Sequence, residues 1–182
     1  MSVKLLPGIG AMLPGGLTLE FGAGPEKALE VLRASAAHLT AQRTCFGGEM
    51  DGRRSLPDAH ESWLSGLVFY PEWDFVAEVG SIAVRLLGGG PGETGRLSCI
   101  EAHGFESGGE IALDGVQLAG IAVDDLGLTI PDLSRQPPGA VVSEQLALRL
   151  RLQRERVTTV LLYDGRPETW AACCAGRARC LA

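Results

Sequence analysis

The residues of this chain that could perform chemistry are few and scattered. His60-Glu61 begins the H-E-x-x-H pattern of zinc proteases, but Leu64 stands where the second histidine ligand is required. Cys99 and His103 are four residues apart, which would place them on one face of a helix, yet two ligands do not make a zinc site. We therefore expect no bound metal ion and no other cofactor.

A glycine-rich stretch at residues 88–95 has the glycine spacing of a phosphate-binding loop. Such a loop needs Lys for the phosphates and Ser or Thr for magnesium, whereas Arg96 and Leu97 stand here. No amphipathic helix follows that could offer its N–H groups to a phosphate. The stretch is therefore interpreted as a link between two halves of the chain.

Nucleophilic and acid–base catalysis lack an assembled motif. A Ser, Cys or Thr nucleophile needs a base and an orienting group, but His38, His60 and His103 lie outside any G-x-S-x-G elbow or recognisable cysteine-hydrolase sequence. Asp124-Asp125 would point about 100° apart on a helix, and acidic residues suit the start of a helix in any case. No catalytic residue is predicted.

One segment has the composition of an interaction site. Residues 70–75 (YPEWDF) stand between two predicted strands, 63–70 and 75–87, and are predicted to form the tip of a hairpin. Exposed Trp and Tyr are typical interface anchors, and nearby carboxylates would meet a basic partner. The alternative is that the aromatic rings fill one end of the core. The candidate partner-binding residues are Tyr70, Glu72, Trp73, Asp74 and Glu78.

The elements that would position these groups follow from the hydrophobic pattern. Apolar and polar residues alternate over 17–21 and again over 146–152, which predicts strands, and helical spacing over 26–38 predicts an amphipathic helix. Because the strands follow one another too closely for parallel crossovers, we predict an α+β fold of antiparallel sheets with one or two helices packed on one face. The other predicted elements are strands at 40–46, 111–117 and 157–163 and a short helix at 122–126.

The pattern repeats loosely along the chain. LTLEFG at residues 17–22 leads into the first predicted helix and VQLAG at 116–120 leads into the second, each followed by paired strands. We predict a tandem repeat, with residues 1–90 and 91–182 as its two copies or as one continuous domain.

These segments resemble the tandem helix-plus-four-strand module of β-lactamase-inhibitor-like proteins and related bacterial modules. In the second copy the resemblance rests on IALDGVQLAGIAVDDL, residues 111–126, and LALRLRLQRERVTTVLLYD, residues 146–164. It covers residues 17–164. Modules of this kind include inhibitors, assembly lipoproteins and toxin-immunity proteins, so the resemblance implies a protein that presents a sheet face to a partner.

Charge and composition narrow the choice of partner and compartment. The net charge is −6, and residues 1–139 alone carry nine basic and eighteen acidic side chains. An acidic body repels phosphate backbones, which excludes nucleic acid and favours a basic protein partner. The five cysteines are irregularly spaced, and the chain has neither a signal-peptide core nor an uninterrupted apolar span. We expect reduced thiols, a cytoplasmic location and no membrane association.

The sequence thus predicts a non-enzymatic binding protein, most simply an immunity or inhibitor protein that occludes the active site of a bacterial toxin or enzyme. One alternative is a small hydrolase that reverses a toxin's modification, with His60 or His103 as its base. Another is a structural or assembly component.

Overall fold

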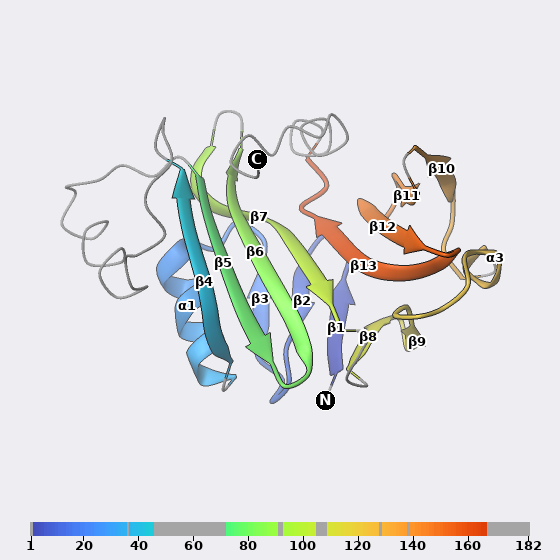
Figure 1. The fold of residues 1–182 in the computed structure, drawn as a ribbon. Coiled ribbons are helices and arrows are strands. Elements are labelled where there is room, and N and C mark those ends of the chain that lie inside the picture. Colours follow the sequence, from blue (N-terminus) through green and yellow to red (C-terminus); the bar gives the residue numbers. More distant parts are fainter. Residues whose placement is uncertain are drawn as a thin grey trace.

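The computed structural model describes residues 2–35, 37–45, 72–90, 93–104, 109–127, 129–137 and 139–166 (Figure 1). The elements up to residue 103 are β1 (Ser2–Leu6), β2 (Gly10–Met12), β3 (Thr18–Glu20), α1 (Pro25–Ala34), β4 (His38–Cys45), β5 (Glu72–Val79), β6 (Ile82–Gly90) and β7 (Glu93–His103). Those that follow are β8 (Glu110–Leu113), β9 (Val116–Gln117), α3 (Val123–Leu126), β10 (Ser134–Gln136), β11 (Ala140–Ser143), β12 (Leu148–Gln153) and β13 (Arg156–Tyr163).

The strands form two sheets. The small sheet has the order β3-β2-β1-β8-β9, and the large sheet has the order β10-β11-β12-β13-β7-β6-β5-β4. Every pairing is antiparallel except that of β1 with β8, which is parallel. In Figure 1 the small sheet and α1 lie behind the large sheet. The predicted α+β fold with antiparallel sheets is confirmed, with sheet predominating over helix.

The order of elements repeats along the described chain. A hairpin (β2–β3), a helix (α1) and a four-stranded meander (β4–β7) are followed by a hairpin (β8–β9), a helix (α3) and a second meander (β10–β13). The two meanders join through the antiparallel pair β7–β13, so they share one sheet. The change between copies falls after β7, whereas the glycine-rich stretch at 88–95 lies where β6 pairs with β7. That stretch is therefore not the predicted link between halves.

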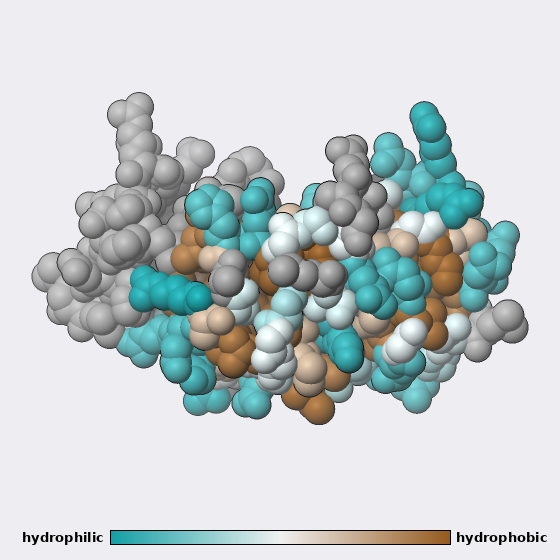
Figure 2. Space-filling model, turned by 90° about the horizontal axis from the view of Figure 1, so that it is seen from below, coloured by the Kyte–Doolittle hydropathy of each residue, from teal (hydrophilic) through white to brown (hydrophobic). Residues whose placement is uncertain are grey.

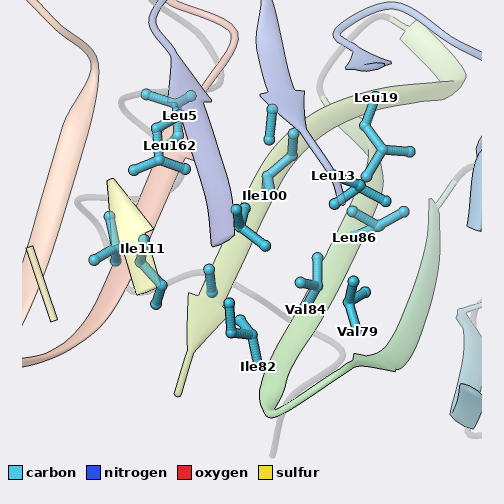
Figure 3. Packing of buried hydrophobic residues seen from close by; sticks show 14 of the residues in the cluster. Leu5, Leu13, Leu19, Val79, Ile82, Val84, Leu86, Ile100, Ile111 and Leu162 are labelled. Carbon is cyan, nitrogen blue, oxygen red and sulfur yellow. The ribbon is translucent and has the colours of Figure 1, made fainter. Parts of the chain in front are cut away.

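The core lies between the two sheets and continues under α1. Figure 3 shows Leu5 and Ile111 of the small sheet close to Leu162 and Ile100 of the large sheet. Leu162 and Ile100 are direct cross-strand partners on β13 and β7, and both are fully buried. One apolar cluster thus contains residues of both repeats, and burial of this kind is the main stabilising contribution to the fold.

Helix α1 begins at Pro25, whose missing N–H has no role at the first helical position. Its buried face includes Ala28, Leu29 and Leu32, as the periodicity predicts. The helix ends at Ala34, earlier than predicted, because Ser35 turns the chain and donates its hydroxyl to the Leu32 carbonyl at 2.9 Å. The backbone then enters β4 within a few residues.

The predicted hairpin at residues 71–74 is wrong in position. Glu72, Trp73 and Asp74 belong to strand β5, and the turn lies at Gly80-Ser81, between the paired residues Val79 and Ile82. The segment 75–87 is therefore two strands, with Gly80 at φ 64° allowing the reversal. The predicted strand at 63–70 lies outside the described residues.

Trp73 occupies the core and not the surface. Its indole is 3% exposed and lies 4.5 Å from the Phe75 ring, centroid to centroid. A Cβ at Gly88 on the neighbouring strand would lie only 1.9 Å from the indole Cε2, so glycine leaves the space that the ring fills. The interpretation of these aromatic residues as core filling is the one that the packing supports.

Candidate functional site

The large sheet has two unlike faces. Its inner face packs on the small sheet and α1, whereas its outer face points away from them. On the outer face Arg85 of β6 stands directly opposite Glu101 of β7, and Glu101 stands opposite Leu161 of β13. Directly opposed residues of an antiparallel pair lie on the same side of a sheet. The outer-face row across five strands is Val76, Arg85, Glu101, Leu161 and Arg149.

A charged network crosses this outer face. The Arg85 guanidinium donates from Nε to both carboxylate oxygens of Asp74, at 2.8 and 3.0 Å, and its Nη2 contacts the same carboxylate. Arg85 Nη1 lies 3.7 Å from Glu101 Oε2, and Arg151 Nη1 lies 3.4 Å from Glu101 Oε1. Asp74, Arg85, Glu101 and Arg151 thus alternate in charge from β5 to β12, and we call them the charged row.

The ion pairs in the middle of the charged row are partly shielded from solvent, which strengthens their electrostatic attraction. The side chains of Asp74, Glu101 and Arg85 are 10%, 14% and 23% exposed, whereas Arg151 is 56% exposed. The hydrogen bonds that Arg85 donates to Asp74 are the main cause that raises the pKa of Arg85 above its ordinary value. The two permanently charged arginines balance the two carboxylates, so the row is suited to fixing a surface and not to transferring protons.

A second group of polar contacts, around Asp132, is structural. Ser143 Oγ donates to Asp132 Oδ1 at 2.6 Å, and the backbone N–H of Gln145 donates to Asp132 Oδ2 at 3.0 Å. The Ser143 hydrogen bond is the main cause that lowers the pKa of Asp132 below its ordinary value of 3.8. Ser143 is fully buried and also accepts the N–H of Leu146, so it anchors the β11–β12 turn. These contacts hold a turn together and do not activate a nucleophile.

Cys99 and His103 do not form a metal pair. Both lie on strand β7 and not on a helix, so four residues separate them by about 13 Å. Cys99 is 3% exposed among Leu161, Tyr163 and Ala147, while His103 is exposed. Within the described ranges, no group of three or more His, Cys, Asp or Glu side chains could hold a metal ion.

The candidate partner-binding residues end up in different environments. Trp73 is in the core, and Asp74 is 7% exposed and bound to Arg85, so neither is an exposed anchor. Glu78 is exposed on the outer face, on the same strand. Glu72 begins β5, and Tyr70, like His60, lies outside the described residues. A role in partner binding stays a prediction, and among the described side chains only Glu78 has the exposure that it requires.

Sequence reasoning missed Arg85 as the partner of Asp74 and Glu101 as the second carboxylate that contacts Arg85. The signal was present in FVAEVGSIAVRLL, because a glycine inside that run marks a turn and folds the run into a hairpin. Such a hairpin brings Arg85 onto the same face as Asp74. Predicting the position of Glu101 requires predicting strand β7, whose start lies in the glycine-rich stretch that the sequence pattern favours as a link.

Comparisons of the chain with family models, with curated proteins and with solved structures found no match. Within the described residues, neither helix has the length and apolar character needed to cross a membrane.

Proposed function

We propose that this protein is a non-enzymatic binding protein, an immunity or inhibitor protein that acts in the cytoplasm by occluding the active site of a basic bacterial toxin or enzyme. The observation that supports it best is the outer face of the large sheet. This face lies outside the packing of the two sheets, and its charged row is held in place by paired arginine and carboxylate groups. A surface fixed before binding loses little conformational entropy when a partner docks.

The charge of the protein favours a basic partner. The net charge of −6 attracts a basic partner over a distance, which accelerates association. On the outer face, exposed Glu78 supplies an acidic group on β5, the strand that also carries the buried Asp74. The contacts already made by Asp74 hold it in place, so Glu78 is the described side chain best placed to engage a basic group directly.

Protection from a toxin tests this proposal. The protein is co-expressed with the products of neighbouring genes, and survival and copurification are measured. Glu78→Lys should abolish protection, because it reverses the charge of the proposed contact. Glu20→Lys, which makes the same change at an exposed side chain of β3, should leave protection intact. Equal loss in both variants, or no binding to any neighbouring product, would contradict the proposal.

Stoichiometry separates this proposal from the hydrolase alternative. A protein that occludes an active site protects only when its concentration reaches that of the toxin, whereas an enzyme protects at trace concentration. We expect toxin activity to fall linearly with added protein and to reach zero at equal molar amounts. Full protection at trace amounts would instead favour an enzyme that reverses the toxin's modification.

A further inference from the structure

The β12–β13 hairpin carries an unusual concentration of arginine for an acidic protein. Arg151, Arg154 and Arg156 fall within six residues at its end, and Arg135 of β10 lies beside them through its ion pair with Glu155. The side chains of Arg135 and Arg151 are 61% and 56% exposed, and Arg154 and Arg156 are exposed as well. We call these four residues the basic hairpin end.

The basic hairpin end is only partly neutralised. Arg135 lies 2.9 Å from Glu155 and 3.9 Å from Asp124, and Arg151 contacts Glu101 of the charged row. Among the residues that the structure describes, Arg154 and Arg156 have no acidic partner. Two exposed guanidinium groups are therefore available to carboxylates from another molecule. Guanidinium groups bind carboxylates through two parallel hydrogen bonds, which gives such a contact both affinity and orientation.

The backbone holds these arginines in a fixed position. Glu155 accepts the N–H of Val123 at 3.0 Å, and Val157 exchanges hydrogen bonds with Gly120 and Ile121, each at 3.0 Å. The Arg156 guanidinium donates to the Gly120 carbonyl at 2.8 Å. The hairpin end is thus attached to the segment that leads into α3, and it offers its charges from a rigid support. Figure 1 places this hairpin and α3 at the right-hand end of the view, and Figure 2 shows hydrophilic residues interspersed with hydrophobic ones at that end.

The β12–β13 turn has charged residues at positions where smaller residues are favoured. Gln153 pairs with Arg156, so Arg154 and Glu155 form a two-residue turn, with φ of 51° and 58°. Positive φ at both positions is the conformation in which Asn-Gly is preferred. Long charged side chains occupy both positions despite the strain, and strain of this kind concentrates at functional positions.

We propose that the basic hairpin end is a docking surface for a short acidic segment of a protein partner, separate from the Glu78 side of the outer face. A short segment fits better than nucleic acid. A polyanion that extends beyond the patch is repelled by the rest of the protein, because the whole chain has a net charge of −6 even with these arginines included. A short acidic segment stays within about 8 Å of the arginines, where screening is weak.

Fluorescence anisotropy with a labelled peptide of alternating Asp and Gly, about ten residues long, tests this proposal on the full-length protein. We expect binding that weakens as salt is raised, and a loss of about tenfold in affinity in Arg154→Gln/Arg156→Gln. The matched control, Lys4→Gln/Lys27→Gln, makes the same change in net charge at exposed positions elsewhere and should retain the affinity. Circular dichroism and the melting temperature report whether each variant is folded.

Three results would overturn the proposal. One is an equal loss of affinity in the control variant, which would show that only overall charge matters. Another is tighter binding of a single-stranded DNA of similar length, which would indicate a nucleic-acid surface. The third is unchanged affinity in Arg154→Gln, a variant whose native side chain makes no described contact and whose fold is not at risk. None of these results bears on the Glu78 test, so the two proposals fail independently.

Discussion

The two repeats of this protein follow the same order of elements but differ in the length of their helix and in the residues of their hairpin turns. In the first, the ten-residue helix α1 covers the meander, and the turn of the β5–β6 hairpin contains Gly80. In the second, α3 has only four residues, and the β12–β13 turn uses Arg154 and Glu155 at positive φ. In both repeats the segment before the helix makes backbone hydrogen bonds to the last strand of the meander, from Gly22 and Ala23 to Leu97 and from Gly120 and Ile121 to Val157. One topology therefore accommodates helices of different length and hairpin turns of different kinds.

A substitution in the core that both repeats share has the largest expected effect, and it tests whether the two repeats unfold together. Leu162→Ala removes a fully buried side chain of the second repeat that stands opposite Ile100 of the first. It should lower the free energy of unfolding by about 3 kcal/mol. Because the repeats share one core, hydrogen exchange should accelerate in both repeats together, and denaturation should remain a single transition. Ile9→Ala, at a side chain that is 54% exposed, is the control and should change little. Faster exchange confined to residues 109–166 would show that the repeats are independent.

The half-buried ion pair of the first repeat should matter more than the exposed pair of the second. Asp74→Ala leaves Arg85 partly buried with only Glu101 nearby, and should lower the free energy of unfolding by about 2 kcal/mol. Arg135→Ala breaks an exposed pair and should cost less than about 0.5 kcal/mol. Urea denaturation of both variants measures the difference. Similar losses in the two variants would mean that burial does not distinguish the pairs.

The two hairpin turns should respond in opposite directions. Arg154→Asn with Glu155→Gly places the preferred residues at positive φ and should raise the free energy of unfolding by about 1 kcal/mol. In the first repeat, Gly80→Ala forces a side chain into positive φ at the β5–β6 turn and should lower the free energy of unfolding by about 1 kcal/mol. Thermal denaturation compares both with the parent protein. A loss of stability in the Asn-Gly variant would show that Glu155 contributes more through Arg135 than its backbone strain costs.

The smallest expected effect is a pH dependence confined to the second repeat. The pKa of Asp132 is lowered in the folded protein, mainly by the hydrogen bond from Ser143. Its contribution to stability is therefore complete above its ordinary pKa of 3.8 and is lost as the pH falls through the lower pKa of the folded state. In Asp132→Asn the melting temperature should depend less on pH in this acid range than in the parent protein. An identical acid limb in both proteins would contradict this assignment.

The sequence by itself determined the local elements. Alternating leucines predicted β12, whose Leu148 and Leu150 are buried while Arg151 is exposed, and Pro25 with the apolar spacing after it predicted α1. These patterns can be recognised in the sequence because the buried side chains of a half-buried strand or helix recur with the period of that element. The order of the elements also indicated a repeat.

Only the tertiary structure decided which strands meet and what lies on each face. The β7–β13 pair, the position of Trp73 beside Gly88 and the partnership of Arg85 with Asp74 all join residues that are distant along the chain. The periodicity of a single segment does not predict such contacts, because the contacts depend on the order of strands in the sheet and on their register. For the same reason YPEWDF suggested an exposed tip: its composition was informative, but a turn at Gly80 placed Trp73 in the core and Asp74 against Arg85.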